Sequence, residues 1–152
     1  ITGGPAKAET KEMARHKKNP AIGTKKTVYA SEIIIDQQDA STLAIDEEIT
    51  LMDWGNAIVR EINKADNGVV QNIVMELHLA GDFKKTEKKI TWLASTTDSP
   101  KLISASLVDF DYLLTKKKIE ENDDWQQYVT PVTEFRKDAL IDSNCAVLKP
   151  GE

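Results

Sequence analysis

Short runs of β-branched and aromatic residues recur along this chain, separated by turn residues. Such side chains favour the extended backbone of strands, and short strands at intervals of about ten residues are typical of β-barrels and sandwiches. Helical periodicity is scarce, so we expect only short helices, one at 39–43 and one that follows Asp123-Asp124 and runs through Tyr128. The strand-like runs begin near Thr27 and lie at 28–29, 33–35, 49–51, 57–62, 69–79, 90–93 and 102–108.

The clearest local pattern is a β-hairpin with arms at 57–62 and 69–79. In the second arm, most apolar residues occupy alternate positions, which indicates an antiparallel strand with one buried face. Between the arms, the Asn67-Gly68 step tolerates the positive φ angles of a tight type I′ turn. We therefore predict that turn at the tip of the hairpin.

Turn and linker residues mark both ends of the chain. Residues 1–26 contain Gly-Gly-Pro and Asn-Pro steps without an apolar period, so we expect a poorly structured linker and basic lead-in segment there. The chain begins without methionine and ends on Lys-Pro-Gly-Glu. Both features suggest a piece of a longer protein.

Charge is unevenly distributed along the 152 residues. Twenty Lys and Arg against 25 Asp and Glu give a formal net charge of −5, which by itself disfavours nucleic acid as a partner. However, residues 1–30 carry seven basic and two acidic residues, and 83–89 carry four basic and one acidic residue. Residues 31–82 carry two basic and eleven acidic residues. The two basic segments can attract an anionic polymer, or each lysine run is simply a solvated surface.

The available residues disfavour several classes of site. No apolar run approaches the roughly 18 residues of a membrane span, and no secretory signal is present. Cys145 is the only cysteine, which excludes a disulfide framework and a cysteine-based zinc cluster and favours a reducing, intracellular setting. With only His16 and His78 as histidines, no convincing catalytic constellation emerges. The acidic run at 120–124 lacks the spacing of a calcium loop and is better read as a helix cap.

What remains is binding by basic and aromatic side chains. Lysines and arginines meet backbone phosphates, and RNA bases stack on aromatic or arginine faces. Tyr29, Trp54 and Trp92 could serve as such platforms. For both tryptophans, packing in the core is the favoured expectation.

Four longer motifs make the chain recognisable. They are 16–26 (His-Lys-Lys-Asn-Pro-Ala-Ile-Gly-Thr-Lys-Lys), 51–56 (Leu-Met-Asp-Trp-Gly-Asn), 81–94 (with Gly-Asp-Phe-Lys-Lys-Thr and Lys-Ile-Thr-Trp-Leu-Ala) and 109–114 (Asp-Phe-Asp-Tyr-Leu-Leu). Together they resemble the anticodon-binding region of glutamyl-tRNA synthetases of the eukaryotic and archaeal type, over about residues 14–150. The Met-Asp-Trp-Gly-Asn motif favours the glutamyl over the glutaminyl enzyme, which stays as an alternative. The segment 130–135 resembles fungal members most.

The resemblance implies an all-β fold of two antiparallel β-barrels, proximal and distal, that grip the anticodon loop of tRNA(Glu). We accordingly expect a mainly proximal barrel at 27–115, and a connection with part of the distal barrel at 116–152. The distal part is expected to be incomplete, because the family continues with further strands.

In the parent enzyme, a class I catalytic domain precedes this region and uses ATP with magnesium to attach glutamate to the tRNA. Neither catalytic signature of that domain occurs here. The resemblance therefore implies a cytoplasmic tRNA-binding module without catalytic residues, metal or cofactor of its own. Its expected partners are tRNA(Glu), the catalytic domain and, as a further candidate, other translation proteins.

The first site candidate is Lys25, at a position where the related glutaminyl enzymes place an arginine at the anticodon. Lys26 and Arg15 adjoin it, and Trp54 is a candidate stacking platform with core packing as its equal alternative. Charge and hairpin placement alone add Arg60, Lys64, Lys84 and Lys85. The competing hypothesis is a protein-interaction or purely structural β-domain whose lysines are solvated.

Overall fold

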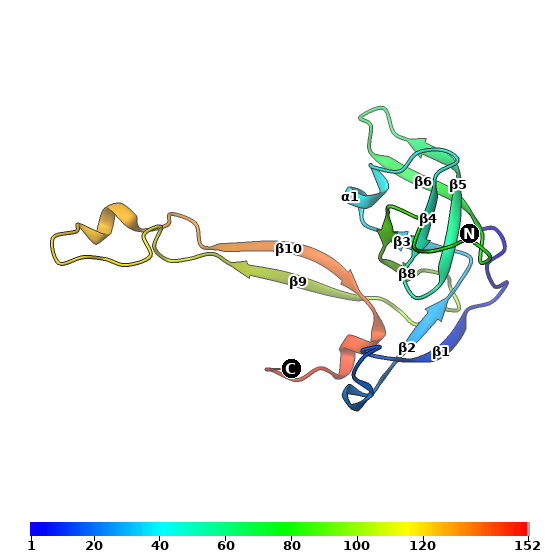
Figure 1. Cartoon of the computed structure of the whole chain (residues 1–152), viewed down its shortest axis with the longest axis horizontal. Coiled ribbons are helices and arrows are strands. Elements are labelled where there is room, and N and C mark those ends of the chain that lie inside the picture. Colours follow the sequence, from blue (N-terminus) through cyan, green and yellow to red (C-terminus); the bar gives the residue numbers. More distant parts are fainter. Residues whose placement is uncertain (152) are drawn as a thin grey trace. The chain divides into compact units, whose positions relative to one another are not determined.

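The computed structural model describes residues 1–151, most of which form short strands and the turns between them (Figure 1). They fall into two compact units: unit 1 comprises residues 1–101 and the segment from Asp142 onward, and unit 2 comprises Leu102–Ile141. The helical segments are α1 (Gln37–Ala40) and the 3-10 turns η1 (Pro20–Ile22), η2 (Trp125–Tyr128) and η3 (Ser143–Val147). The expectation of a mainly β chain with few short helices is confirmed.

Unit 1 contains three sheets. β1 (Glu9–Ala14) pairs with β2 (Thr24–Tyr29), and β3 (Ile33–Ile35) pairs with β8 (Trp92–Ala94), both antiparallel. The third sheet has the order β6-β5-β4-β7. Its members are β4 (Glu48–Leu51), β5 (Gly55–Lys64), β6 (Val70–Leu77) and β7 (Lys89–Ile90), of which only the β4–β7 pairing is parallel.

The core of unit 1 lies on β4 and β5. Ile49, Leu51, Ala57 and Val59 are completely buried, and full burial of such an aliphatic side chain contributes about 1.5–3 kcal/mol. Tyr29, from β2, and Trp92, from β8, belong to the same cluster. Trp92 is 9% exposed, so the expectation that it packs in the core is confirmed.

The hairpin predicted from the alternating pattern is confirmed as β5 and β6, but the predicted type I′ turn is wrong. In that turn both central residues need a positive φ, and Asn67 is not among the positive-φ residues, whereas Gly68 has φ 81°. The Ala65 N–H donates to the Val69 carbonyl at 2.8 Å, which makes the loop three residues long. A glycine with positive φ at the third loop position is the usual closure of such loops.

The expectation of little structure in residues 1–26 is also wrong. β1 pairs with β2 over six residues, from Glu9 opposite Tyr29 to Ala14 opposite Thr24. Five of its six side chains are exposed, and only Met13 is half-buried. This strand is therefore stabilised mainly by its backbone hydrogen bonds to β2, and the sequence shows no alternation of apolar residues that would predict it.

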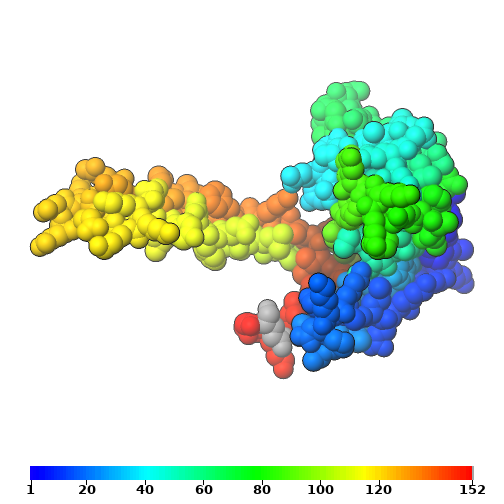
Figure 2. Space-filling model, viewed as in Figure 1, coloured from blue at the N-terminus to red at the C-terminus, as the bar shows by residue number. Residues whose placement is uncertain are grey.

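Unit 2 is a long antiparallel hairpin of β9 (Ile103–Phe110) and β10 (Glu134–Ile141). Its end loop contains η2, which confirms the helical turn expected after Asp124, whose side chain caps it. In Figure 2 the unit forms a narrow ribbon, coloured yellow to orange. Large apolar side chains stay exposed on it, among them Phe110 (75%), Tyr112 (83%) and Leu113 (73%).

Every sheet in residues 1–151 has open edges, and none closes into a barrel. The two predicted barrels are therefore not confirmed, and their assignment to 27–115 and 116–152 stays a prediction. No helix in the described part of the chain is both long and apolar enough to cross a lipid bilayer.

Candidate nucleic-acid interface

The hairpin of β1 and β2 carries a concentrated group of cations at its end, blue in Figure 1. The turn is well ordered by backbone contacts: the Arg15 N–H donates to the Gly23 carbonyl at 2.9 Å, and the Asn19 side chain caps η1. Gly23 has φ 92°, which favours glycine at this position. We call the five basic residues here the basic tip: Arg15, Lys17, Lys18, Lys25 and Lys26.

A single carboxylate holds two lysines of the basic tip. Asp53 Oδ2 lies 2.9 Å from Lys25 Nζ, and Asp53 Oδ1 lies 3.0 Å from Lys17 Nζ. The Asp53 side chain is only 17% exposed, against 35% for Lys25 and 77% for Lys17. The hydrogen bond from Lys25, and then that from Lys17, hold the pKa of Asp53 below its usual range despite its partial burial.

The loop that carries Asp53 joins β4 to β5 and is anchored through its backbone. The Tyr29 hydroxyl donates to the Asp53 carbonyl at 2.8 Å, and Trp92 Nε1 donates to the Met52 carbonyl at 2.8 Å. Asp53 itself has φ 60° and Gly55 has φ 143°, both outside the common regions for most residues. The φ of Gly55 strains any residue with a Cβ, whereas the nearest atom to such a Cβ, Leu79 Cδ2 at 2.7 Å, is the end of an exposed and flexible side chain. The carboxylate is thus presented from a fixed backbone.

Three aromatic rings pack together at this loop, and one of them, Trp54, belongs to the loop itself. The Trp54 ring lies 5.3 Å from Tyr29 in an edge-to-face arrangement and 4.7 Å from Trp92, centroid to centroid. Such pairs add about 0.5–1.5 kcal/mol each beyond their burial. Trp54 is half-buried and packs against the core cluster. Its role as a stacking platform for a base stays a prediction.

Three of the predicted site residues, Arg15, Lys25 and Lys26, lie at the same end of the β1–β2 hairpin. Arg15 Nε donates to the Thr24 carbonyl at 3.0 Å, which leaves its other donors available. The Lys26 side chain is exposed, while its backbone is paired with the side-chain amide of Asn144. That amide accepts from the Lys26 N–H at 3.0 Å and donates to the Lys26 carbonyl at 2.7 Å, so it occupies the free edge of β2.

The other predicted cations lie elsewhere on unit 1. Arg60, on β5, is paired with Asp46 at 3.0 Å and with Glu76 at 2.8 Å. Lys64 lies near the end of the β5–β6 hairpin, and Figure 1 places that end far from the basic tip. Lys84 and Lys85 are exposed on the loop between β6 and β7.

A buried polar network fixes the loop of Lys84 and Lys85. Thr50 Oγ1 donates to Asn56 Oδ1 at 2.9 Å and lies 2.6 Å from Thr86 Oγ1, with all three residues buried. Asn56 and then His78 hydrogen-bond Glu48 and hold its pKa below the usual range. These hydrogen bonds fix the backbone of the loop that carries Lys84 and Lys85.

Sequence reasoning missed three residues of this arrangement as individual candidates: Lys17, Asp53 and Asn144. Lys17 and Asp53 both lie within the motifs that carried the family resemblance, which is the signal that could have found them. Asn144 is 118 positions from its partner Lys26. Nothing local in the sequence marks that pairing.

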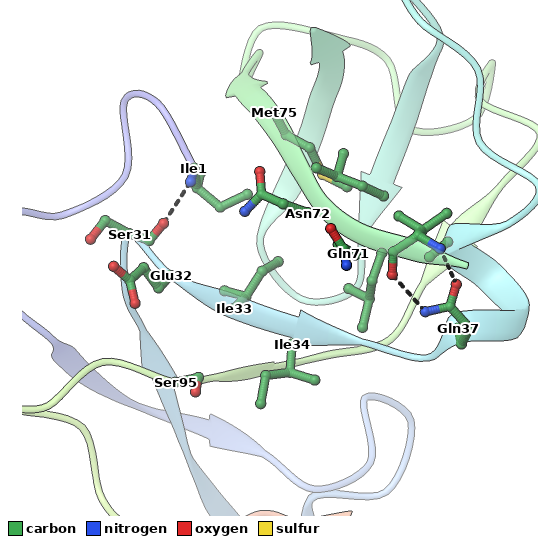
Figure 3. A pocket seen from close by; sticks show the side chains of 14 residues that line it. Ile1, Ser31, Glu32, Ile33, Ile34, Gln37, Gln71, Asn72, Met75 and Ser95 are labelled. Carbon is green, nitrogen blue, oxygen red and sulfur yellow. Dashed lines mark hydrogen bonds between the residues drawn. The ribbon is translucent and has the colours of Figure 1, made fainter. Parts of the chain in front are cut away.

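A cavity of about 400 Å³ lies between β3 and the edge strand β6 (Figure 3). Glu32 is the only ionisable side chain in its wall. Gln37 lies at one end, where its amide pairs with both the N–H and the carbonyl of Val70. The lining contains no acid–base pair or nucleophile set. Within residues 1–151, no three His, Cys, Asp or Glu side chains gather to hold a metal ion.

Comparison with known proteins identifies the family of the chain. A model of the family described as "tRNA synthetases class I (E and Q), anti-codon binding domain" matches residues 1–78, just over half of the chain. The chain belongs to this family. The family match includes the basic tip and the loop of Asp53, and it ends before Lys84 and Lys85.

Curated relatives from several eukaryotes match over the whole chain. It is 51% identical to a probable cytoplasmic glutamate–tRNA ligase of Schizosaccharomyces pombe and 46% identical to the cytoplasmic glutamate–tRNA ligase of Saccharomyces cerevisiae. It is 41% identical to the cytoplasmic glutamate–tRNA ligase of Arabidopsis thaliana. Each match covers 21% of the relative, so the chain spans about a fifth of the length of these family members. The predicted resemblance to this family is confirmed.

Proposed function

We propose that this chain is the anticodon-recognition module of a cytoplasmic glutamate–tRNA ligase, and that the basic tip contacts the anticodon region of tRNA(Glu). One observation carries the proposal: the anticodon-binding family match spans the hairpin on which five cations gather. The glutamyl identity is supported by the names of the relatives at 41–51% identity.

The basic tip has the physical properties that phosphate binding needs. Lys18 and Lys26 are exposed, and their side chains form no ion pair with another residue in the described part of the chain. Such lysines can exchange their water and counterions for phosphate oxygens, and the release of counterions from the RNA drives binding. Because the chain is acidic overall, this cationic surface favours one docking position.

We further propose that unit 2 belongs to the distal of two β-barrels, which further strands of the longer enzyme complete. This proposal moves β9 from the proximal barrel expected at 27–115 into the distal one, because β9 pairs with β10 in unit 2. Two-stranded hairpins are marginally stable alone, and soluble proteins rarely expose large contiguous apolar patches. The half-exposed Phe135 (53%) and Leu107 (49%) on β10 and β9 would be covered by such strands. Proximal-barrel closure around unit 1 is also proposed, since β6 is the last strand of its sheet. A bridge from Thr2 and the side-chain amide of Gln37 already pair with parts of its outer edge.

Catalysis, ATP and magnesium are assigned in this proposal to the catalytic domain of the parent enzyme, which is also the intramolecular partner of this module. The residues described here offer no cluster that fits a magnesium ion. Binding of tRNA(Gln) instead of tRNA(Glu), or binding of no RNA at all, are the competing outcomes. The second would favour an interaction or structural β-domain.

The test is a binding titration with tRNA(Glu) and tRNA(Gln) between about 50 and 200 mM salt. Lys18→Ala with Lys26→Ala should weaken tRNA(Glu) binding and reduce the salt slope by about 1.4, or roughly 0.7 for each lost contact to a single-stranded phosphate. The matched control is Lys7→Ala with Lys101→Ala, two exposed lysines outside the basic tip. Equal effects of both double variants, or no affinity for tRNA at low salt, would overturn the proposal.

A further inference from the structure

We propose that Asp53 is a positioning and specificity-determining residue of the basic tip, and that it restrains Lys17 and Lys25 from binding RNA indiscriminately. The inference rests on the proposed RNA-binding function and adds a role that opposes affinity. A carboxylate beside a phosphate-binding surface repels the very ligand that surface attracts. Its presence at the centre of the basic tip therefore needs a function.

The two lysines that contact Asp53 differ in how far their side chains are exposed. Lys25 is 35% exposed and lies on β2, next to a carboxylate that is itself mostly covered. Lys17 is 77% exposed, although its ammonium lies 3.0 Å from Asp53 Oδ1. An ammonium group has three donors, so Lys17 can keep its contact with Asp53 and offer its remaining donors outward. Asp53 thereby fixes the place at which Lys17 meets a phosphate.

The charges set the energetic consequence. Two ammonium groups and one carboxylate leave a net charge of +1 at this point instead of +2. The charge centre of a phosphate that binds Lys17 lies about 6 Å from the Asp53 oxygen, because two contacts of about 3 Å diverge from one tetrahedral nitrogen and the phosphorus lies beyond its own oxygen. In water, repulsion between unit charges at that distance lowers affinity roughly threefold. An RNA that contacts the basic tip through its phosphates alone is therefore bound weakly. The anticodon region of tRNA(Glu) offsets the repulsion from Asp53 through additional contacts, which require Lys17 and Lys25 to be held in place.

Asp53→Asn isolates the charge from the backbone. Asparagine tolerates the positive φ of this position as aspartate does, so the turn is retained. The chain also supplies a matched control in Asp46→Asn. Asp46 has φ 63°, is ion-paired with Arg60 and precedes β4, whereas Asp53 follows it. Both variants change the net charge equally, but only Asp53 contacts the basic tip.

The experiment measures binding of the whole chain to the anticodon stem-loop of tRNA(Glu) and to an unrelated stem-loop of the same length, across a salt series. Asp53→Asn should bind the unrelated stem-loop roughly threefold more tightly and steepen its salt slope by about 0.7. The ratio of the two affinities should fall, because the matching RNA gains the same relief from repulsion but loses the contacts that need fixed lysines. A merely structural role would instead weaken binding of both RNAs, so the sign of the effect separates the two.

Each outcome decides between the hypotheses. If the unmodified chain discriminates and Asp53→Asn discriminates equally well, the role of Asp53 is overturned and the proposed function stands. If the unmodified chain does not discriminate but Asp53→Asn alone gains affinity, the proposed function fails and the restraint by Asp53 stands. If Asp46→Asn gains as much affinity, or no variant binds either RNA at low salt, the inference is wrong.

Discussion

The hydroxyl of Tyr29 provides a direct test of how the loop of Asp53 is held. Tyr29 is 6% exposed, and its hydroxyl donates to the Asp53 carbonyl at 2.8 Å. Burial, and then the nearby charge of Asp53, raise the pKa of this phenol, so it stays protonated and able to donate at neutral pH. Tyr29→Phe removes this hydrogen bond together with the 3.1 Å contact between the hydroxyl and Met13 Sδ. It keeps the ring packed against Trp54 and Trp92.

The cost comes mainly from the hydrogen bond to the Asp53 carbonyl, because the thioether sulfur of Met13 is a weak acceptor. A lost bond contributes about 0.5–1.5 kcal/mol, and an acceptor left without a partner in a part-buried site adds to this. We therefore expect Tyr29→Phe to lower the free energy of unfolding by about 1–2 kcal/mol. For a chain of this size each kcal/mol lowers the Tm by about 2–4 °C, so the expected decrease is about 2–8 °C.

Thermal unfolding followed by circular dichroism measures this shift. The matched control is Tyr112→Phe, because Tyr112 is 83% exposed on unit 2 and loses the same atom. Its Tm should stay within about 1 °C of the unmodified chain, as expected for an exposed site. Equal Tm values for the two variants would refute the claim that Tyr29 anchors the loop.

The ion pairs of Asp53 make the stability of the chain depend on pH. Because the pKa of Asp53 is lowered in the folded state, these ion pairs stabilise the fold above about pH 4, and this stabilisation is lost as the pH falls through the folded pKa. The Tm difference between the unmodified chain and Asp53→Asn should therefore be constant from about pH 5 to 7 and shrink below about pH 4; a difference that grows on acidification would contradict this. Leu51→Ala, at a completely buried site, should cost about 2–5 kcal/mol in urea unfolding, against less than about 0.5 kcal/mol for Leu113→Ala on the exposed face. Arg60→Ala should reduce tRNA affinity less than Lys26→Ala, because two carboxylates compete for the Arg60 guanidinium; the reverse order in a binding titration would place the interface on β5.

The strands that bury apolar side chains could be predicted from the sequence, because burial imposes a pattern on it. β4, β5, β6 and β9 each coincide with a β-branched or alternating run. β1 could not be found this way, since its side chains are mostly exposed and its stability comes from backbone pairing. The turn type at Gly68 could not be predicted either, because an Asn-Gly step fits both a two-residue and a three-residue loop. The backbone pairing of Ala65 with Val69 selects the three-residue loop.

The candidate site shows the same division. The basic residues near 15–26 are adjacent in the sequence, so their clustering could be predicted from charge alone. The carboxylate that organises them is 28 positions from Lys25, and its approach depends on the packing of the loop between β4 and β5. Charge counts also cannot distinguish Arg60, which forms ion pairs with two carboxylates, from Lys26, whose side chain is exposed. Only the folded arrangement separates these residues.

Backbone amide NMR of the ¹⁵N-labelled chain, titrated with the anticodon stem-loop of tRNA(Glu), tests the central claim most directly. The account predicts that chemical-shift changes concentrate on residues 15–26 and on the loop of Asp53, and that they diminish as salt increases. Changes confined to the end of the β5–β6 hairpin near Lys64, with the basic tip unaffected, would contradict it.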